Sequence, residues 1–472
     1  MRKAMLILFT FIMVMVSACS TSAGGNTGGA QTSNVGQTNT EQVKNGTGTT
    51  PPKGETSGTK NSTEKKTIVF STYFSDDFFL EAKKRYEAKH PNITIDLQYI
   101  ETSNENDEAA WEKFEKTTNA AMLSGKGPDL IQMDQLPSGD YVKKNLLANI
   151  GDMIDKDPSF QKEQYFNNVL DGIKVNGGIY GMPMGFFIYG LMGNETVIEK
   201  SGVKIDDSNW NWEQFTDLAK EIVKKAGGNH FALGGVAPEN MIKDLVNGQY
   251  ATFVDLESRK ANFDSAAFIE LLKEVKLMSD EKMIREDYGG IFYNEFINSP
   301  QTYIRELRNS DFLQKPYKSK FYSRPNASGQ EAGGFFRTYK TIGINASSAV
   351  KDEAWDFIKF MLSDEMQDQG RGAGFSLNKA TYKKVAQDVL KKGKVMSDQP
   401  VGPLKGKEFE ITQKDIDDLE KFLIDAKYPV QFKPSKIDEI LLKESKAYFT
   451  GQKSPEEVAK LIQNRVTTVL NE

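Results

Sequence analysis

Residues 68–133 alternate between short apolar segments and segments with helical periodicity, and this alternation constrains the fold more than any other feature. Three apolar segments predict strands, at 68–72, 93–99 and from about 129. The segments between them carry apolar or small residues at helical spacing, namely Phe79, Ala82 and Tyr86 in the first and Phe114, Thr118 and Ala121 in the second. A β-α-β-α-β order predicts an α/β fold with a parallel sheet, whose ligands bind beyond the carboxyl ends of the strands.

The length and charge of the chain narrow its class. Of 472 residues, roughly 400 follow the polar N-terminal region, which is too many for one ordinary core and predicts two domains. A net charge of −5 and a pI near 5.6 argue against a nucleic-acid binder. No long apolar run follows the N-terminus, which argues against further membrane spans.

The N-terminus predicts export and lipid anchoring. Residues 1–18 have the charged start and short apolar run of a signal peptide, and VSAC at residues 16–19 spans its end. This ending resembles the lipobox of bacterial lipoproteins, which implies that Cys19, the only cysteine, carries the lipid (palmitate). An ordinary signal peptide is the alternative. Residues 19–66 are rich in Gly, Ser, Thr and Asn and predict a disordered tether, as on the outer face of a Gram-positive cell membrane.

The stretch GGIYGMPMG, residues 177–185, combines four glycines with a proline in an apolar setting. Glycines permit backbone rotation and a proline fixes the exit direction, so the composition suits a joint between two domains. A plain β-hairpin turn explains the same residues. Further along, Ser454, Pro455 and Glu457 predict a capped start for the last helix.

Five segments resemble, in the same order, those of extracellular solute-binding protein family 1, the receptors of ABC sugar importers. They are SGKGPDLIQMD, GGIYGMPMGFFIYGLMGNETVIEKSGV, SNWNWEQFTDLAKEI, TIGINASSAVKDEAWDFIKFMLSDEMQ and AYFTGQKSPEEVAKLIQNRVTTVLNE. The resemblance covers residues 68–472 with gaps. FINSPQTYIREL departs from the family pattern, so the pocket on the second lobe is not assigned from it.

The resemblance implies a two-lobed periplasmic-binding-protein type II fold, each lobe a mainly parallel sheet flanked by helices, with the hinge at GGIYGMPMG. We expect lobe 1 at 67–180 and 335–378, and lobe 2 at 186–330 and 379–472. The implied function is a lipid-anchored monomeric receptor that captures a mono- or oligosaccharide and delivers it to ABC permease subunits, without catalysis, cofactor or metal.

A sugar site needs aromatic rings against C–H faces and polar groups around the hydroxyls. Strand ends and the segments matching the family supply the candidates: Tyr73, Phe74, Asp76, Asp134, Phe187, Tyr189, Phe335, Phe336, Arg337 and Phe375. For each ring the alternative is core packing, and for Asp134 it is a helix cap.

Two other functions stay open at this point. The same fold could bind a peptide, a polyamine or an anion. A secreted polysaccharide-degrading enzyme is the rival class, although the chain has no G-x-S-x-G, H-E-x-x-H or phosphate-loop motif. Asp207, Asn209, Asn211 and Glu213 alternate as in the start of a calcium loop, but the required glycine and terminal glutamate are missing, and helix capping explains this segment better.

Overall fold

A computed structural model describes residues 64–471, except 102–107, 135, 228–229, 256–257, 288, 309–317, 328, 368–373, 403 and 431–434. The signal peptide, Cys19 and nearly all of the expected tether therefore lie outside the described residues. Among the described residues, no helix has the length and apolar character needed to cross a bilayer.

The first five elements confirm the alternation predicted from the sequence. They are β1 (Lys66–Ser71), α1 (Asp77–Lys89), β2 (Ile93–Gln98), α2 (Glu108–Leu123) and β3 (Leu130–Gln132). β1 pairs in parallel with β2 on one side and with β3 on the other. Phe79, Ala82 and Tyr86 of α1 are buried against these strands. The cap of α1 is Asp76, whose side chain accepts a hydrogen bond from the Phe78 amide at 2.9 Å.

Helices and short strands make up the middle of the chain. The next elements are α3 (Ser138–Lys143), α4 (Ile150–Lys156), a 3₁₀ turn (Lys162–Gln164), α5 (Asn167–Gly172), β4 (Met182–Asn194), α6 (Glu195–Ser201) and α7 (Trp212–Ala226). They are followed by β5 (Leu233–Gly234), α8 (Pro238–Gly248), α9 (Tyr250–Phe253), β6 (Val254–Asp255), β7 (Lys260–Ala261), α10 (Ala266–Asp280), β8 (Ile284–Arg285) and β9 (Phe292–Ile297).

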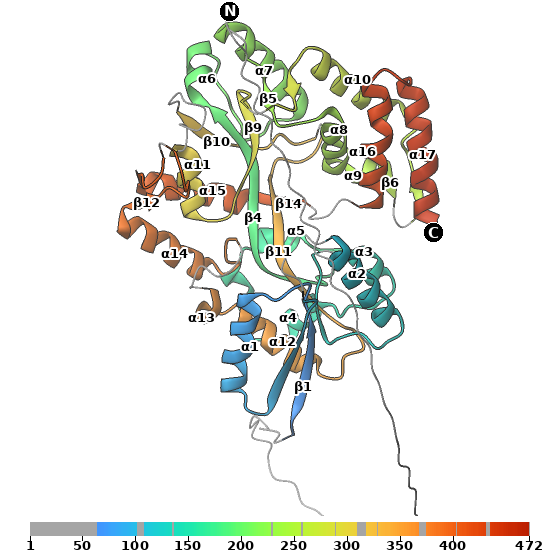
Figure 1. Cartoon of the computed structure of the whole chain (residues 1–472), viewed down its shortest axis with the longest axis vertical. Coiled ribbons are helices and arrows are strands. Elements are labelled where there is room, and N and C mark those ends of the chain that lie inside the picture. The colour runs from blue at the N-terminus through green and yellow to red at the C-terminus, as the bar shows by residue number, and fades with distance from the viewer. Residues whose placement is uncertain are drawn as a thin grey trace, which may run out of the picture. The chain divides into compact units, whose positions relative to one another are not determined.

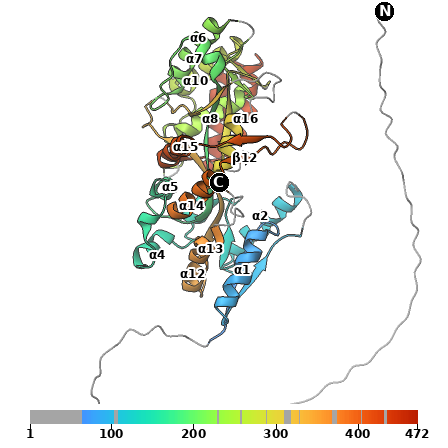
Figure 2. The ribbon, with the colours of Figure 1, turned by 90° about the vertical axis from the view of Figure 1, so that its left-hand side faces the viewer.

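The remaining elements complete both ends of the molecule. They are α11 (Pro300–Arg308), β10 (Ser319–Ser323), β11 (Gly334–Ile344), α12 (Lys351–Met361), α13 (Asp364–Gln367), α14 (Lys379–Lys392), β12 (Lys394–Met396), β13 (Glu408–Glu410), α15 (Gln413–Asp425), β14 (Ala426–Pro429), α16 (Lys436–Phe449) and α17 (Pro455–Asn471). β12 and β13 pair as an antiparallel hairpin, which projects sideways in Figure 2.

The large sheet repeats one strand order twice. The first set runs β2-β1-β3-β11-β4 and the second runs β8-β5-β9-β4-β10. In each set three parallel strands are followed by two antiparallel neighbours. β4 belongs to both sets, and β14 adds to β11 in parallel. Two α/β sets of the same order, joined through shared strands, are the architecture of a two-lobed protein of the expected type.

β4 and β11 run side by side through the middle of Figure 1 and connect the two sets. The stretch 177–185 lies at the start of this pair. Its first two residues end a tight turn in which the Val175 and Gly178 amides and carbonyls bond reciprocally, at 2.9 and 3.0 Å, with Gly177 at φ +80°. Its last four residues are already strand β4. Residues 179–181 belong to neither element and connect the two, and rotation about this segment stays a prediction.

Two large cores lie along the sheet. The first gathers the side chains of β1, β2 and α1 with those of α12, α14 and α15, and the second gathers the side chains of α7, α8 and α10 with those of α16 and α17. Residues 379–426, grouped with lobe 2 from the sequence, contribute their buried side chains to the first core. The expected lobe boundaries stay a prediction.

Capped starts are present at α7 and at α17. Asn211 and Gln214 form a reciprocal capping box at the start of α7. At the last helix, the Glu457 carboxylate accepts from the Ser454 amide at 2.8 Å, and the Ser454 hydroxyl accepts from the Glu457 amide at 3.1 Å. Both caps satisfy backbone donors that a helix start leaves open.

Candidate functional site

The antiparallel pair β4–β11 has one core face and one open face. Because strand side chains alternate, Phe186 and Phe336 point into the first core, whereas Phe187 and Arg337 lie opposite each other on the other face. Tyr189 pairs with Phe335 on one side and with Phe296 of β9 on the other. Three neighbouring strands therefore present aromatic residues to the same face.

Four rings on this face form a continuous row, which we call the aromatic row: Tyr339, Phe187, Phe296 and Tyr189. Successive ring centroids are 5.5, 5.9 and 6.0 Å apart, and the planes of successive rings differ by only 25° to 32°. Phe296 is 43 % exposed, and the two tyrosines are half-buried. Phe187 is buried between them, at 7 % exposed. The three other rings are held by cross-strand neighbours and still reach solvent, so they offer flat apolar surface.

Two arginines flank the row. The Arg337 guanidinium lies 5.3 Å from the Phe187 centroid and 5.6 Å from that of Tyr189. Arg324 lies 5.3 Å from the Phe335 ring and forms an ion pair with Asp244 at 2.9 Å. Burial raises the pKa of Tyr189, against the opposing effect of both arginines, so its hydroxyl stays protonated at neutral pH. The face thus combines apolar rings with planar hydrogen-bond donors.

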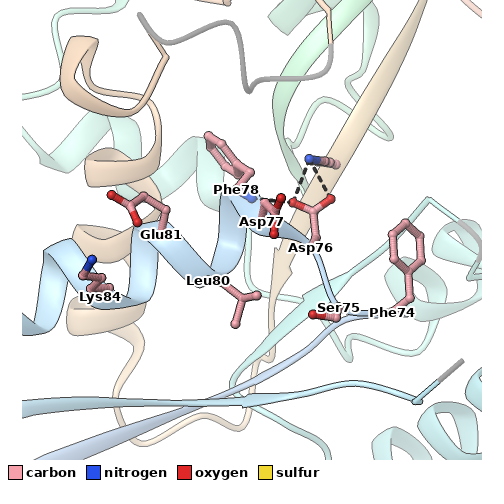
Figure 3. A pocket seen from close by; sticks show the side chains of 9 residues that line it. Phe74, Ser75, Asp76, Asp77, Phe78, Leu80, Glu81 and Lys84 are labelled. Atoms are coloured by element: carbon pink, nitrogen blue, oxygen red, sulfur yellow. Dashed lines mark hydrogen bonds and ion pairs between the residues drawn. The ribbon is translucent and has the colours of Figure 1, made fainter. Parts of the chain in front are cut away.

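A second feature, a hollow of about 730 Å³, opens beside the β1–α1 connection. Figure 3 shows Phe74, Ser75, Asp76 and Asp77 along its wall, followed by residues on the first turns of α1. Lys340 of β11 also lines it and forms an ion pair with Asp76 at 2.7 Å. Phe74 and Asp76 therefore lie where the sequence places them, beyond the carboxyl end of β1.

Asp134 follows β3 and bonds to the neighbouring strand. Its carboxylate accepts from the Thr341 amide at 3.2 Å and from the Gln132 amide group at 3.1 Å. Burial raises the pKa of Asp134 to about 6, and these hydrogen bonds oppose the rise. The alternative role as a helix cap is wrong, because the N-cap of α3 is Pro137 and no side chain caps that helix.

The other predicted ligand residues are placed apart from the row. Tyr73 is buried and stacked on Trp111. Phe336 and Phe375 lie in the first core, where both approach Phe186. Phe335 is buried beside Tyr428, with ring centroids 5.5 Å apart. Their assignment as solute contacts remains a prediction, but of these four only Phe335 adjoins the open face.

Gly374 explains how the chain passes beneath the row. Its φ is +100°, and a Cβ there would lie 2.5 Å from the Phe186 carbonyl oxygen and 2.6 Å from the Phe187 ring. Only glycine fits both the backbone angle and this close approach. The Phe186 and Phe375 backbones bond reciprocally at 3.1 and 2.8 Å just beside it, so the segment supports the strand that carries Phe187.

The calcium alternative is not supported by the geometry of 207–213. Asp207 accepts from the Ser323 amide at 2.8 Å, and Asn211 caps α7. Among the residues that the structure describes, no group of three or more His, Cys, Asp or Glu side chains could hold a metal ion.

Four residues of the candidate site were not predicted from the sequence: Phe296, Tyr339, Arg324 and Lys340. Phe296 falls in the segment that departs from the family pattern. Tyr339 follows Arg337 at strand spacing, so the alternation in FFRTYK was a usable signal. Arg324 and Lys340 are placed by ion pairs with Asp244 and Asp76, which lie far away in the chain. Sequence periodicity does not reveal such long-range contacts.

Sequence comparison decides the family. The profile of the bacterial extracellular solute-binding protein family matches residues 75–368. The chain belongs to this family. A putative binding protein of Brucella abortus (strain 2308) is 20% identical over 308 residues, covering 61% of this chain and 69% of the relative. A lactose-binding protein of Rhizobium radiobacter is 27% identical over 156 residues, 32% of this chain and 34% of the relative.

Solved structures agree with the fold. A family 1 solute-binding protein of Alicyclobacillus acidocaldarius superposes with a TM-score of 0.58 at 15% identity, covering 87% of this chain and 100% of that one. The sugar-binding protein MalE of Xanthomonas citri gives a TM-score of 0.58 at 16% identity, covering 86% and 98%. At these identities the likeness establishes the two-lobed fold and leaves the solute to be argued from the site.

Proposed function

We propose that this solute-binding protein is a receptor that captures a carbohydrate on the aromatic row and delivers it to the permease subunits of an ABC importer. The observation that carries the proposal is the row itself. Sugar rings have apolar C–H faces that pack on aromatic planes and hydroxyls that need donors at the edge. Tyr339, Phe187, Phe296 and Tyr189 supply the planes, and Arg337 supplies donors beside them.

The length of the row favours a solute with more than one sugar ring. Four ring centroids follow one another at spacings of 5.5–6.0 Å. One hexose covers one or two such rings. The lactose-binding and sugar-binding relatives are consistent with this class of solute.

A thermal-shift screen tests the solute class. We would measure Tm with glucose, lactose, maltotriose and an oligogalacturonide, and in parallel with spermidine, a tripeptide and sulfate. A ligand at 100 times its Kd stabilises the fold by about 2.7 kcal/mol, which corresponds to roughly 3 °C for a body of this size. A shift with spermidine, peptide or sulfate and none with any glycan would contradict the carbohydrate.

Catalysis is not part of the proposal. A receptor binds and releases its solute unchanged, whereas a polysaccharide-degrading enzyme produces new reducing ends. Incubating the purified chain with maltotriose and the oligogalacturonide separates the two. An increase in reducing ends that disappears on heat denaturation would favour the enzyme.

We further propose that Cys19 carries the lipid that holds the receptor at the outer face of the membrane. The support is the signal-like start with its VSAC ending. Metabolic labelling with an alkyne-palmitate should mark the full chain, and Cys19→Ser should abolish both the label and membrane fractionation. Equal labelling of the variant would contradict the anchor.

A further inference from the structure

Lys340 has a conformation that strand residues rarely adopt. Its φ is +52°, in the left-handed region that favours glycine, although it stands inside β11. The neighbouring residues keep the ladder, since Tyr339 pairs with Gly185 and Thr341 with Pro183. Lys340 is therefore a local irregularity at the point where β11 passes from β3 to the aromatic row.

The Lys340 side chain is buried and paired. It is only 6 % exposed, and its ammonium lies 2.8 and 2.7 Å from the two carboxylate oxygens of Asp76. The ammonium also lies 5.2 Å from the Phe78 ring and 5.6 Å from the Phe79 ring. Asp76 is fixed in turn, because it caps α1. The pair thus joins the first helix to β11 across 264 positions of sequence.

This pair is a poor source of net stability. Both charges lose hydration on burial, and the strained backbone adds a further cost. Because the Lys340–Asp76 pair adds little net stability, its presence is better explained by the backbone geometry that it enforces. That geometry concerns the two neighbours of Lys340: Tyr339 belongs to the aromatic row, and the Thr341 amide is held by Asp134.

We propose that Lys340 is a positioning residue for solute binding: its ion pair with Asp76 holds β11 in the left-handed turn that sets Tyr339 against Phe187. The role in solute binding rests on the proposed function, whereas the effect of Lys340 on the position of the Tyr339 ring does not. Loss of the pair lets the strand relax toward regular β geometry and moves the Tyr339 ring out of the row.

The test uses the position of the Tyr339 ring without any solute. Protein labelled with 3-fluorotyrosine gives ¹⁹F resonances, and Tyr339→Phe identifies the resonance of Tyr339 by its loss. Lys340→Met removes the charge, and Asp76→Asn removes it from the other side while asparagine still caps α1. We expect the Tyr339 resonance to shift or broaden in both variants. If Lys340→Met does not fold, Asp76→Asn decides.

A matched control separates positioning from general destabilisation. Lys359 pairs with Asp157 at 2.8 Å in the same half of the molecule. Lys359→Met should lower Tm and leave the Tyr339 resonance in place. An unchanged Tyr339 resonance in folded Lys340→Met and Asp76→Asn, or an equal change in Lys359→Met, would overturn the inference.

Binding of maltotriose provides the functional arm. If the wild type binds it, Lys340→Met should weaken binding roughly 5- to 10-fold, comparable to the loss of one stacked ring, and Lys359→Met should not. A shifted resonance with unchanged affinity would overturn the role in binding. If no glycan of the screen binds the wild type, the carbohydrate proposal fails, and the ¹⁹F comparison still decides whether Lys340 positions Tyr339.

Discussion

The two faces of the β4–β11 pair use the same strands and the same residue types for different ends. On one face Phe186 and Phe336 are enclosed by the first core. On the other, Phe187 and its neighbours form a row that reaches solvent at Phe296. What distinguishes the two faces is how far their side chains are buried on folding. The type of side chain does not distinguish them. Phe186 and Phe336 are enclosed on one face, whereas on the other face Phe187 is covered by its neighbours and the ring that reaches solvent is Phe296 of β9.

The largest test of this comparison removes one ring from each face. Phe186→Ala should lower the free energy of unfolding by about 3–5 kcal/mol, because it opens a cavity in a packed core. Phe296→Ala should change it by less than about 1 kcal/mol, because the ring is already half in water. Urea denaturation at constant m measures both. Equal decreases in the free energy of unfolding for the two variants would contradict the difference in burial between the two faces.

A second test concerns the polar end of the pair, where Asp134 meets Thr341. The raised pKa of about 6 means that between pH 4 and 6 the folded state binds a proton that the unfolded state has released. The protonated Asp134 carboxyl therefore adds to the free energy of unfolding at pH 4, and this contribution is lost as the pH rises through 6. The loss amounts to about 2–3 kcal/mol, and Asp134→Asn should remove it.

Urea denaturation of the wild type and Asp134→Asn at pH 4, 5, 6 and 7 gives the difference directly. Other acidic groups titrate in both proteins and cancel in the comparison. The wild type should lose stability relative to the variant across this range. Parallel curves would show that the Asp134 carboxylate is not held in its neutral form.

A third, smaller effect concerns binding by the open face. Phe296→Ala should weaken binding of the glycan found in the thermal-shift screen roughly 5- to 10-fold, since one stacked ring contributes about 1 kcal/mol. Leu277→Ala on α10, which is 50 % exposed and away from the row, is the matched control. Isothermal titration calorimetry measures both. Equal affinities for the two variants would argue against the row.

The smallest effect is expected for Arg337→Lys. Lysine keeps the charge but loses the planar guanidinium that lies over Phe187 and Tyr189. We expect about 2- to 4-fold weaker binding, corresponding to less than about 1 kcal/mol, and unchanged stability. A loss as large as that of Phe296→Ala would mean that Arg337 contacts the solute through more than one hydrogen bond.

Much of the fold followed from local patterns. The β-α-β-α-β start and the capped starts of α7 and of the last helix were predicted and are confirmed. These features depend on periodicity and capping, which involve residues close together in the chain. The two-lobed class was implied by the family resemblance, and the solved structures confirm it. Ser75 fits the N-cap pattern ahead of the first helix in the sequence, whereas the structure has Asp76 as the N-cap of α1, one residue later.

The site was only partly accessible to the same reasoning. Phe187, Tyr189 and Arg337 lie together on the open face, as expected for residues near the crossing between the lobes. The position of Phe336 and Phe375 in the chain predicts ligand contacts, but strand alternation turns Phe336 into the core, and the backbone pairing with Phe186 holds Phe375 there. Which face of a strand is open depends on how distant elements pack against it. This packing cannot be predicted from a single sequence.

Because β4 completes both strand orders, its length ties the two halves of the molecule together. Inserting a single residue between Met182 and Asn194 would interchange inward and outward side chains along the remainder of the strand. Phe186 and Ile188 would then leave the first core for the opposite face, and Phe187 and Tyr189 would enter that core in their place. Loops can lengthen during evolution without this penalty, so the thirteen residues of β4 should tolerate insertion far less than the described loops do.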